Sequence, residues 1–120
     1  MRNALLKITC LSLFSLGAFA QMEIVEIEKP QPARSVAGLV SDPSGSALPN
    51  VTVEERSEDW KTVLRSTETD DKGRFHFSKT PRKTTYRLQF GCSGFNWVRI
   101  TLRLDKKAAT AVVVKMPLGT

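Results

Sequence analysis

Between residues 35 and 116, apolar side chains recur at every second position in short runs. This alternation places apolar side chains on one face of an extended strand and polar ones on the other. The clearest run is 97–104, in which apolar residues alternate with Arg99, Thr101 and Arg103. No segment shows the 3.6-residue period of an amphipathic helix, so the pattern predicts an all-β fold.

Turn residues divide this region into about seven runs. The runs fall at residues 36–40, 51–56, 61–67, 75–77, 84–90, 97–104 and 111–116. The strongest turn signal is Thr69-Asp70-Asp71-Lys72-Gly73, where Asp and Gly suit the tight turn of a hairpin. Short strands at this spacing are typical of a β-sandwich or barrel.

The first twenty residues have the pattern of a secretory signal peptide. Arg2 and Lys7 are basic, residues 8–19 are mostly apolar, and Ala18-Phe19-Ala20 is a small-x-small cleavage site. The apolar stretch is shorter than the roughly 20 residues of a comfortable transmembrane helix. We therefore expect a secreted or periplasmic protein with no integral membrane segment after cleavage; an uncleaved anchor is the alternative.

Residues 21–34 lie between this segment and the first predicted strand. Pro30 and Pro32 favour an extended, polyproline-like chain. We expect a flexible tether. Because acidic and apolar residues alternate over 22–28, an edge strand with Ile24 and Glu26 on one face is the second interpretation.

The composition limits the chain to one small domain, expected at residues 35–117. The chain has 18 Lys and Arg against 12 Asp and Glu. Cleavage after residue 20 would leave 16 basic residues and a net charge of +4, too little to argue for nucleic acid. It would also remove Cys10, so Cys92 would form no internal disulfide. Cys92 is then either a small, partly buried residue or a site of intermolecular pairing, and an oligomer is possible.

Two segments carry a family resemblance. Residues 45–53 have the pattern Gly-x-Ala-x-Pro-x-Val-x-Val, and residues 69–77 have the pattern Thr-Asp-x-x-Gly-x-Phe-x-Phe. Together with the opening strand at 36–42 and the Ser93-Gly94-Phe95 loop, they resemble the carboxypeptidase regulatory-like domain. This family has a transthyretin-like, or prealbumin-like, β-sandwich. The resemblance extends over residues 36–116.

The resemblance implies a seven-stranded Greek-key β-sandwich, here in the form of a small secreted bacterial protein. It also implies an accessory module that is mainly non-enzymatic. The chain departs from the family at Pro81-Arg82-Lys83-Thr84-Thr85-Tyr86, where a Pro-x-Gly-x-Tyr segment is usual. We expect the loop to differ in shape there.

The residues offer little for catalysis or metal binding, so we expect no enzyme activity, no metal and no cofactor. His76 is the chain's only histidine, and with Cys92 it does not make a zinc site. Asp70 and Asp71 are too few for calcium, which takes six to eight oxygens. No Ser-His-Asp, Cys-His or phosphate-loop pattern is present. Asn50 begins an Asn-Val-Thr glycosylation sequon, which matters only in a host with that machinery.

Two features could form a ligand or partner surface. Arg87, Arg99 and Arg103 point to the polar side of their predicted strands and would form a basic patch if those strands are neighbours. Phe95 and Trp97, beside Asn96, could stack on a sugar ring or anchor a partner. Alternatively, Phe95 caps the edge of the sandwich and Trp97 covers a neighbouring strand.

The sequence therefore favours a non-catalytic secreted or envelope module with a structural or protein-interaction role. A carbohydrate-binding module of the cell envelope is the alternative. The expected partner is an envelope protein or a glycan. Trp60, at the start of a predicted strand, fits either role.

Overall fold

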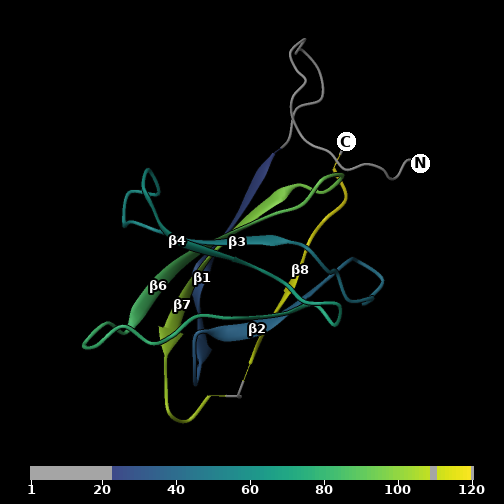
Figure 1. Ribbon diagram of the computed structural model, residues 1–120. Helices are drawn as coiled ribbons and strands as arrows, with labels where there is room; N and C mark the ends of the chain where they lie inside the picture. The colour runs from purple at the N-terminus through teal and green to yellow at the C-terminus, as the bar shows by residue number, and fades with distance from the viewer. Residues whose placement is uncertain (1–22, 109–110, 120) are drawn as a thin grey trace.

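The computed structural model describes residues 23–108 and 111–119, and in these ranges the chain forms eight strands in two packed sheets (Figure 1). The five-stranded sheet has the order β1-β7-β6-β3-β4, and the three-stranded sheet has the order β5-β2-β8. The strands are β1 (Ile24–Ala33), β2 (Ala37–Ser41), β3 (Thr52–Arg56), β4 (Val63–Glu68), β5 (Arg74–His76), β6 (Thr85–Gly91), β7 (Trp97–Leu104) and β8 (Val112–Lys115).

The predicted all-β sandwich is confirmed. Each of the seven alternating runs overlaps one strand, from β2 to β8, and the chain passes back and forth between the two sheets. Among the described residues, no helix has the length and apolar character needed to cross a membrane. The predicted signal peptide, residues 1–20, lies outside the described residues.

The inward faces of the two sheets form the core. Phe75 of β5 and Phe90 of β6 meet edge to face, with ring centroids 5.3 Å apart. The largest fully buried side chains come from the strands of both sheets and from residues next to them: Tyr86, Phe90, Leu88, Ile100, Leu102, Met116, Val36, Val40, Val51, Val53, Val98 and Val114. Burying each large apolar side chain contributes about 1.5–3 kcal/mol, so this shared core holds the sheets together.

Residues 24–33 correct the expectation of a flexible tether. They form β1, which pairs in parallel with β7 from Ile24 opposite Trp97 to Ala33 opposite Leu104. The register shifts between Ile27 and Gln31, so that the segment containing Pro30 leaves the ladder. Proline is tolerated at such an irregularity on an edge strand. The edge-strand interpretation was therefore the right one, and the strand count is eight rather than seven.

The turn before β5 explains the Thr-Asp-x-x-Gly pattern. The Asp70 carboxylate accepts hydrogen bonds from the backbone N–H groups of Lys72 and Arg74, both at 2.9 Å. The backbone bond from Arg74 is the main cause that lowers the pKa of Asp70. Gly73 has φ +75°, and a Cβ there would lie 2.5 Å from the Val40 carbonyl oxygen. Only glycine fits this position without strain.

The loop before β6, where the family's glycine is missing, is closed by other means. Arg82 adopts the left-handed conformation, with φ +68°, that glycine would adopt without strain. The Tyr86 hydroxyl accepts a hydrogen bond from Thr80 N at 3.0 Å and donates to Lys83 O at 3.2 Å. The loop is thus fixed to the start of β6 at the cost of one strained residue.

Candidate functional site

The candidate site lies on the outer face of the five-stranded sheet, which is turned away from the core. β6 and β7 are antiparallel neighbours, as the basic-patch prediction required. Gln89 lies opposite Arg99, and Arg87 lies opposite Thr101. Residues directly opposite each other share a face, so Arg87 and Arg99 project from the same side. Arg103, opposite Thr85, is exposed at the far end of that side.

Trp60 reaches this face from the loop between β3 and β4. Its ring centroid is 4.7 Å from Arg99 Cζ and 5.9 Å from Arg87 Cζ, both within the range of cation–π contacts. The sequence left the role of Trp60 open and did not join it to the arginines. A single sequence offers no signal for this contact, because the loop brings Trp60 across two strands.

Trp60 is held in a strained backbone conformation. Its φ is +68°, which is rare for a bulky residue. Its N–H donates to Ser57 O at 2.9 Å, and its carbonyl oxygen accepts from Arg56 Nη1 at 2.9 Å. The Asp59 carboxylate accepts hydrogen bonds from Ser57 Oγ and Lys61 N; the Ser57 bond is the main cause that lowers the pKa of Asp59. Strain of this kind concentrates at functional sites.

The two arginines beneath Trp60 have neutral hydrogen-bond partners. Arg99 Nε donates to Gln89 Oε1 at 2.9 Å, and Arg87 Nη1 donates to Thr101 Oγ1 at 3.0 Å. Within the described part of the chain, neither guanidinium has a carboxylate within 4.0 Å, whereas Arg56, Arg65, Arg74 and Lys83 each have one. The positive charge of Arg87 and Arg99 is therefore left without a direct counter-ion.

Trp97 lies flat on the same face. A Cβ added at Gly91 would be 3.1 Å from Trp97 Cε2 and 3.4 Å from two of the atoms bonded to it, Cδ2 and Cζ2. That pattern places the glycine directly beneath the face of the indole, an arrangement in which an aromatic ring shields a strand glycine. The side chain is still 36% exposed. Trp97 thus covers a neighbouring strand and remains accessible to a ligand.

Phe95 does not join this face. It packs against the core and forms an isolated bridge with Leu118 of the C-terminal segment. Asn96, proposed beside Trp97, is buried, and its N–H donates to Pro117 O at 2.9 Å. The position of Phe95 fits the second interpretation of the sequence, in which this residue caps the edge of the sandwich. We define the outer-face site as Trp60, Arg87, Trp97 and Arg99.

A second cluster of cations lies at the same end of the sandwich but on the inner side of β3. Glu55 is buried and binds Arg65 Nε at 2.5 Å and the Lys83 ammonium group. Burial alone would raise the pKa of Glu55, but the hydrogen bonds and charges of Lys83 and Arg65 outweigh it and hold that pKa below its ordinary value. Arg65 also donates to Ser78 O at 2.6 Å, which joins β4 to the segment after β5.

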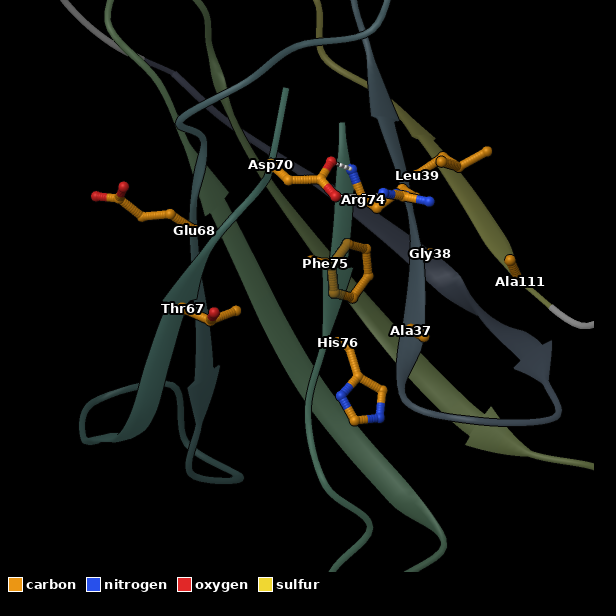
Figure 2. A pocket seen from close by; sticks show the side chains of 10 residues that line it. All are labelled: Ala37, Gly38, Leu39, Thr67, Glu68, Asp70, Arg74, Phe75, His76 and Ala111. Carbon is orange, nitrogen blue, oxygen red and sulfur yellow. Dashed lines mark hydrogen bonds and ion pairs between the residues drawn. The ribbon is translucent and has the colours of Figure 1, made fainter. Parts of the chain in front are cut away.

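A shallow groove of about 560 Å³ lies beside β5 (Figure 2). Thr67 and Glu68 of β4 border it on one side, and β2 borders it on the other. His76 lines it, while Asp70 is bound to Arg74 Nε at 2.9 Å. In the described ranges, no three His, Cys, Asp or Glu side chains gather closely enough to hold a metal ion. The groove brings together no set of groups comparable to the outer-face site.

Comparison with known proteins agrees with the fold and with the resemblance. A family model for the carboxypeptidase regulatory-like domain matches residues 35–117. No curated protein matches the chain. The matched family is a regulatory, non-catalytic type of domain. The match covers most of the chain, from the segment before β2 to the residue after Met116, and the chain belongs to the carboxypeptidase regulatory-like domain family.

Proposed function

We propose that the protein is a non-catalytic accessory module of the secreted or envelope compartment that binds a partner protein through its outer-face site. The compartment is supported by the signal-peptide pattern of residues 1–20. The non-catalytic role is supported by the family. The binding role rests on one observation: two arginines without a carboxylate within 4.0 Å contact the Trp60 ring on the sheet face that also carries Trp97.

The chemistry of this face favours a protein partner. Trp and Arg are the residues that most often dominate the binding energy of protein interfaces. The face is a sheet surface rather than an enclosed cleft, and clefts are what small molecules usually occupy. A partner that places carboxylates over Arg87 and Arg99 would supply the counter-ions that the chain itself does not.

The test is a cross-linked pull-down from the envelope fraction of the host, with the purified protein as bait. Trp97→Ala and Arg99→Gln each remove one group of the outer-face site. Lys115→Gln removes a charge from the exposed face of β8, on the three-stranded sheet, and serves as the matched control. We expect one protein at near-stoichiometric yield with the unaltered bait and the control, and little with the two site variants. Equal recovery with all four baits would contradict the proposal.

A glycan is the second candidate, and Trp97 is the observation that favours it. One face of its indole lies on Gly91 while the side chain stays exposed, as a sugar-stacking platform requires. Tryptophan fluorescence that shifts or quenches on addition of oligosaccharides, and no longer does so in Trp97→Ala, would support this role. Glycan binding that disappears at moderate salt would indicate only nonspecific charge attraction.

A further inference from the structure

β1 is an added strand at the edge of the five-stranded sheet (Figure 1). The family match begins at residue 35, so β1 precedes the matched domain. β1 pairs with β7 along most of its length. Without it, the backbone N–H and C=O groups on one side of β7 would form an open edge. The fold therefore needs a strand at this position.

Apart from this backbone pairing, β1 is weakly attached to the domain. Ala33 is its one residue in the buried core, and Ile24 and Ile27 are 49% and 37% exposed. Among the described residues, no side chain of β1 takes part in an ion pair. The backbone ladder to β7 therefore holds the strand in place, and the same strand from a second copy would form that ladder equally well.

A very short link joins β1 to β2. β1 ends at Ala33 and β2 begins at Ala37 on the other sheet, so residues 34–36 cross between the sheets. The carbonyl oxygens of Ala33 and Val36 both accept backbone hydrogen bonds at 2.8 Å, which fixes the chain on each side of the crossing. Packed sheets lie about 10 Å apart and each residue spans at most about 3.6 Å, so the link has little slack. Short, taut links favour exchange of the attached strand between copies.

The free side of β1 is poorly suited to pairing with another chain. Pro30 and Pro32 have no backbone N–H to donate, and the register shift between Ile27 and Gln31 interrupts the strand. Prolines and irregularities of this kind prevent edge-to-edge pairing of sheets. Exchange of β1, in contrast, uses a pairing that the fold already contains.

We propose that two copies of this chain exchange β1, so that each β1 pairs with β7 of the other copy. The exchanged dimer keeps the β1–β7 ladder and changes the conformation of residues 34–36. It also brings the second copy to the outer-face site. Ile24 lies opposite Trp97 and Glu26 opposite Arg99, and register partners share a side of the sheet. In the dimer, these two β1 residues come from the other chain. The exchange does not depend on the proposed partner protein.

Disulfide trapping between two variants of the full chain tests the exchange. Val25 and Val98 are register partners on β1 and β7. The Val25→Cys protein and a mass-tagged Val98→Cys protein are unfolded in urea, refolded together and oxidised. We expect a covalent heterodimer, because a disulfide between these positions needs neighbouring strands. Val25→Cys mixed with tagged Val63→Cys is the control, since Val63 is 43% exposed at the other edge of the same sheet.

The two mixtures separate exchange from random collision of thiols. Exchange predicts about tenfold more heterodimer with Val98→Cys, which is buried in a closed chain, than with the exposed Val63→Cys. Equal yields from the two mixtures would overturn the proposal, as would the absence of heterodimer from both.

The length of the link provides a second measurement that needs no cysteine variant. Six Gly and Ser residues inserted after Ser35 give the chain enough slack to close on itself. Sedimentation equilibrium should then show a dimer fraction about fivefold lower than that of the unaltered protein. The same insertion after Ser44, in the exposed turn after β2, is the control and should change the fraction less than about twofold. A dimer fraction that ignores the link, or an unaltered protein that is monomeric at every concentration, would contradict the exchange.

Discussion

Two regions of this sandwich bring cations and aromatic rings together. In one of them a buried carboxylate pairs with the cations, and in the other no carboxylate of the described residues does. On the inner side, Arg65 lies 4.8 Å from the Phe77 ring and Lys83 lies 5.1 Å from the Tyr86 ring. Both cations bind Glu55. On the outer face, Arg87 and Arg99 contact the Trp60 ring, and their hydrogen-bond partners are Thr101 and Gln89.

The difference separates a structural cluster from the surface that we propose for binding. Around Glu55, charge is neutralised and each donor joins one part of the fold to another. Around Trp60, the charge is held in position by neutral partners and stays available. Burying a charge without a counter-ion is costly, so the outer-face arginines remain half-exposed while Glu55 is buried.

The largest effect is expected when the inner cluster loses its carboxylate. Glu55→Gln leaves Arg65 and Lys83 facing each other without a counter-ion, and we expect the free energy of unfolding to fall by about 2–4 kcal/mol. Urea denaturation measures it. Glu54→Gln breaks the pair with Arg56; the Glu54 side chain is 21% exposed against 3% for Glu55, so the loss should be about 1 kcal/mol or less. Similar losses in the two variants would show that burial does not distinguish them.

The same cluster predicts a pH dependence of stability. The pKa of Glu55 in the folded protein lies below its ordinary value of 4.5. As the pH falls, the unfolded chain is therefore protonated first, and the stability supplied by ionised Glu55 is lost as the pH falls through the folded-state pKa. Other carboxylates also contribute to the pH dependence of stability. The difference in the free energy of unfolding between the unaltered protein and Glu55→Gln therefore isolates the contribution of Glu55. That difference should be constant near neutral pH and shrink in acid; a constant difference throughout would contradict the assignment.

Supplying the missing carboxylate to the outer face should make it resemble the inner cluster. Gln89→Glu keeps the side-chain shape and places a negative charge beside Arg99 Nε. We expect stability to change by about 1 kcal/mol or less, since pairing and burial of the new charge oppose each other. Recovery of the partner should fall about fivefold or more. Gln89→Met, which removes the hydrogen bond without adding charge, is the control and should retain more of the partner.

The smallest effect concerns the loop that carries Lys83. Arg82→Gly relieves the strain of the left-handed conformation in the folded protein, but it also raises the conformational entropy of the unfolded chain. These two effects on the free energy of unfolding partly cancel. We expect a net gain of about 0.5 kcal/mol in thermal or urea unfolding. Arg82→Ala retains the strain and should not stabilise. Destabilisation by Arg82→Gly would mean that the arginine side chain, rather than the backbone, holds the loop.

The alternation of side chains was sufficient to predict the sandwich and most of its strands. It failed for residues 24–33, where two prolines argued for a free chain, because the partner of an edge strand lies more than seventy residues away at β7. The same alternation contained the signal for Glu55, which follows Val51 and Val53 on the inward side of β3. The alternation alone does not show which cations reach this inward carboxylate, because Arg65 and Lys83 come from other segments of the chain.

The candidate site was only partly predictable. The sequence identified Arg87, Arg99 and Trp97, since period-two alternation assigns a face to each strand residue. It could not assign Trp60, whose position depends on a loop conformation, nor separate Phe95 from Trp97, whose different burial depends on the C-terminal segment that covers Phe95.

The most direct test of the central claim is site-specific photo-cross-linking in the host. A photoreactive phenylalanine analogue replaces Trp97 on the outer-face site in one variant and Val113, which is 60% exposed on β8 of the other sheet, in a second. The account predicts a discrete cross-linked partner from position 97 and none from position 113. A partner captured from position 113 alone would contradict it and place the binding surface on the three-stranded sheet.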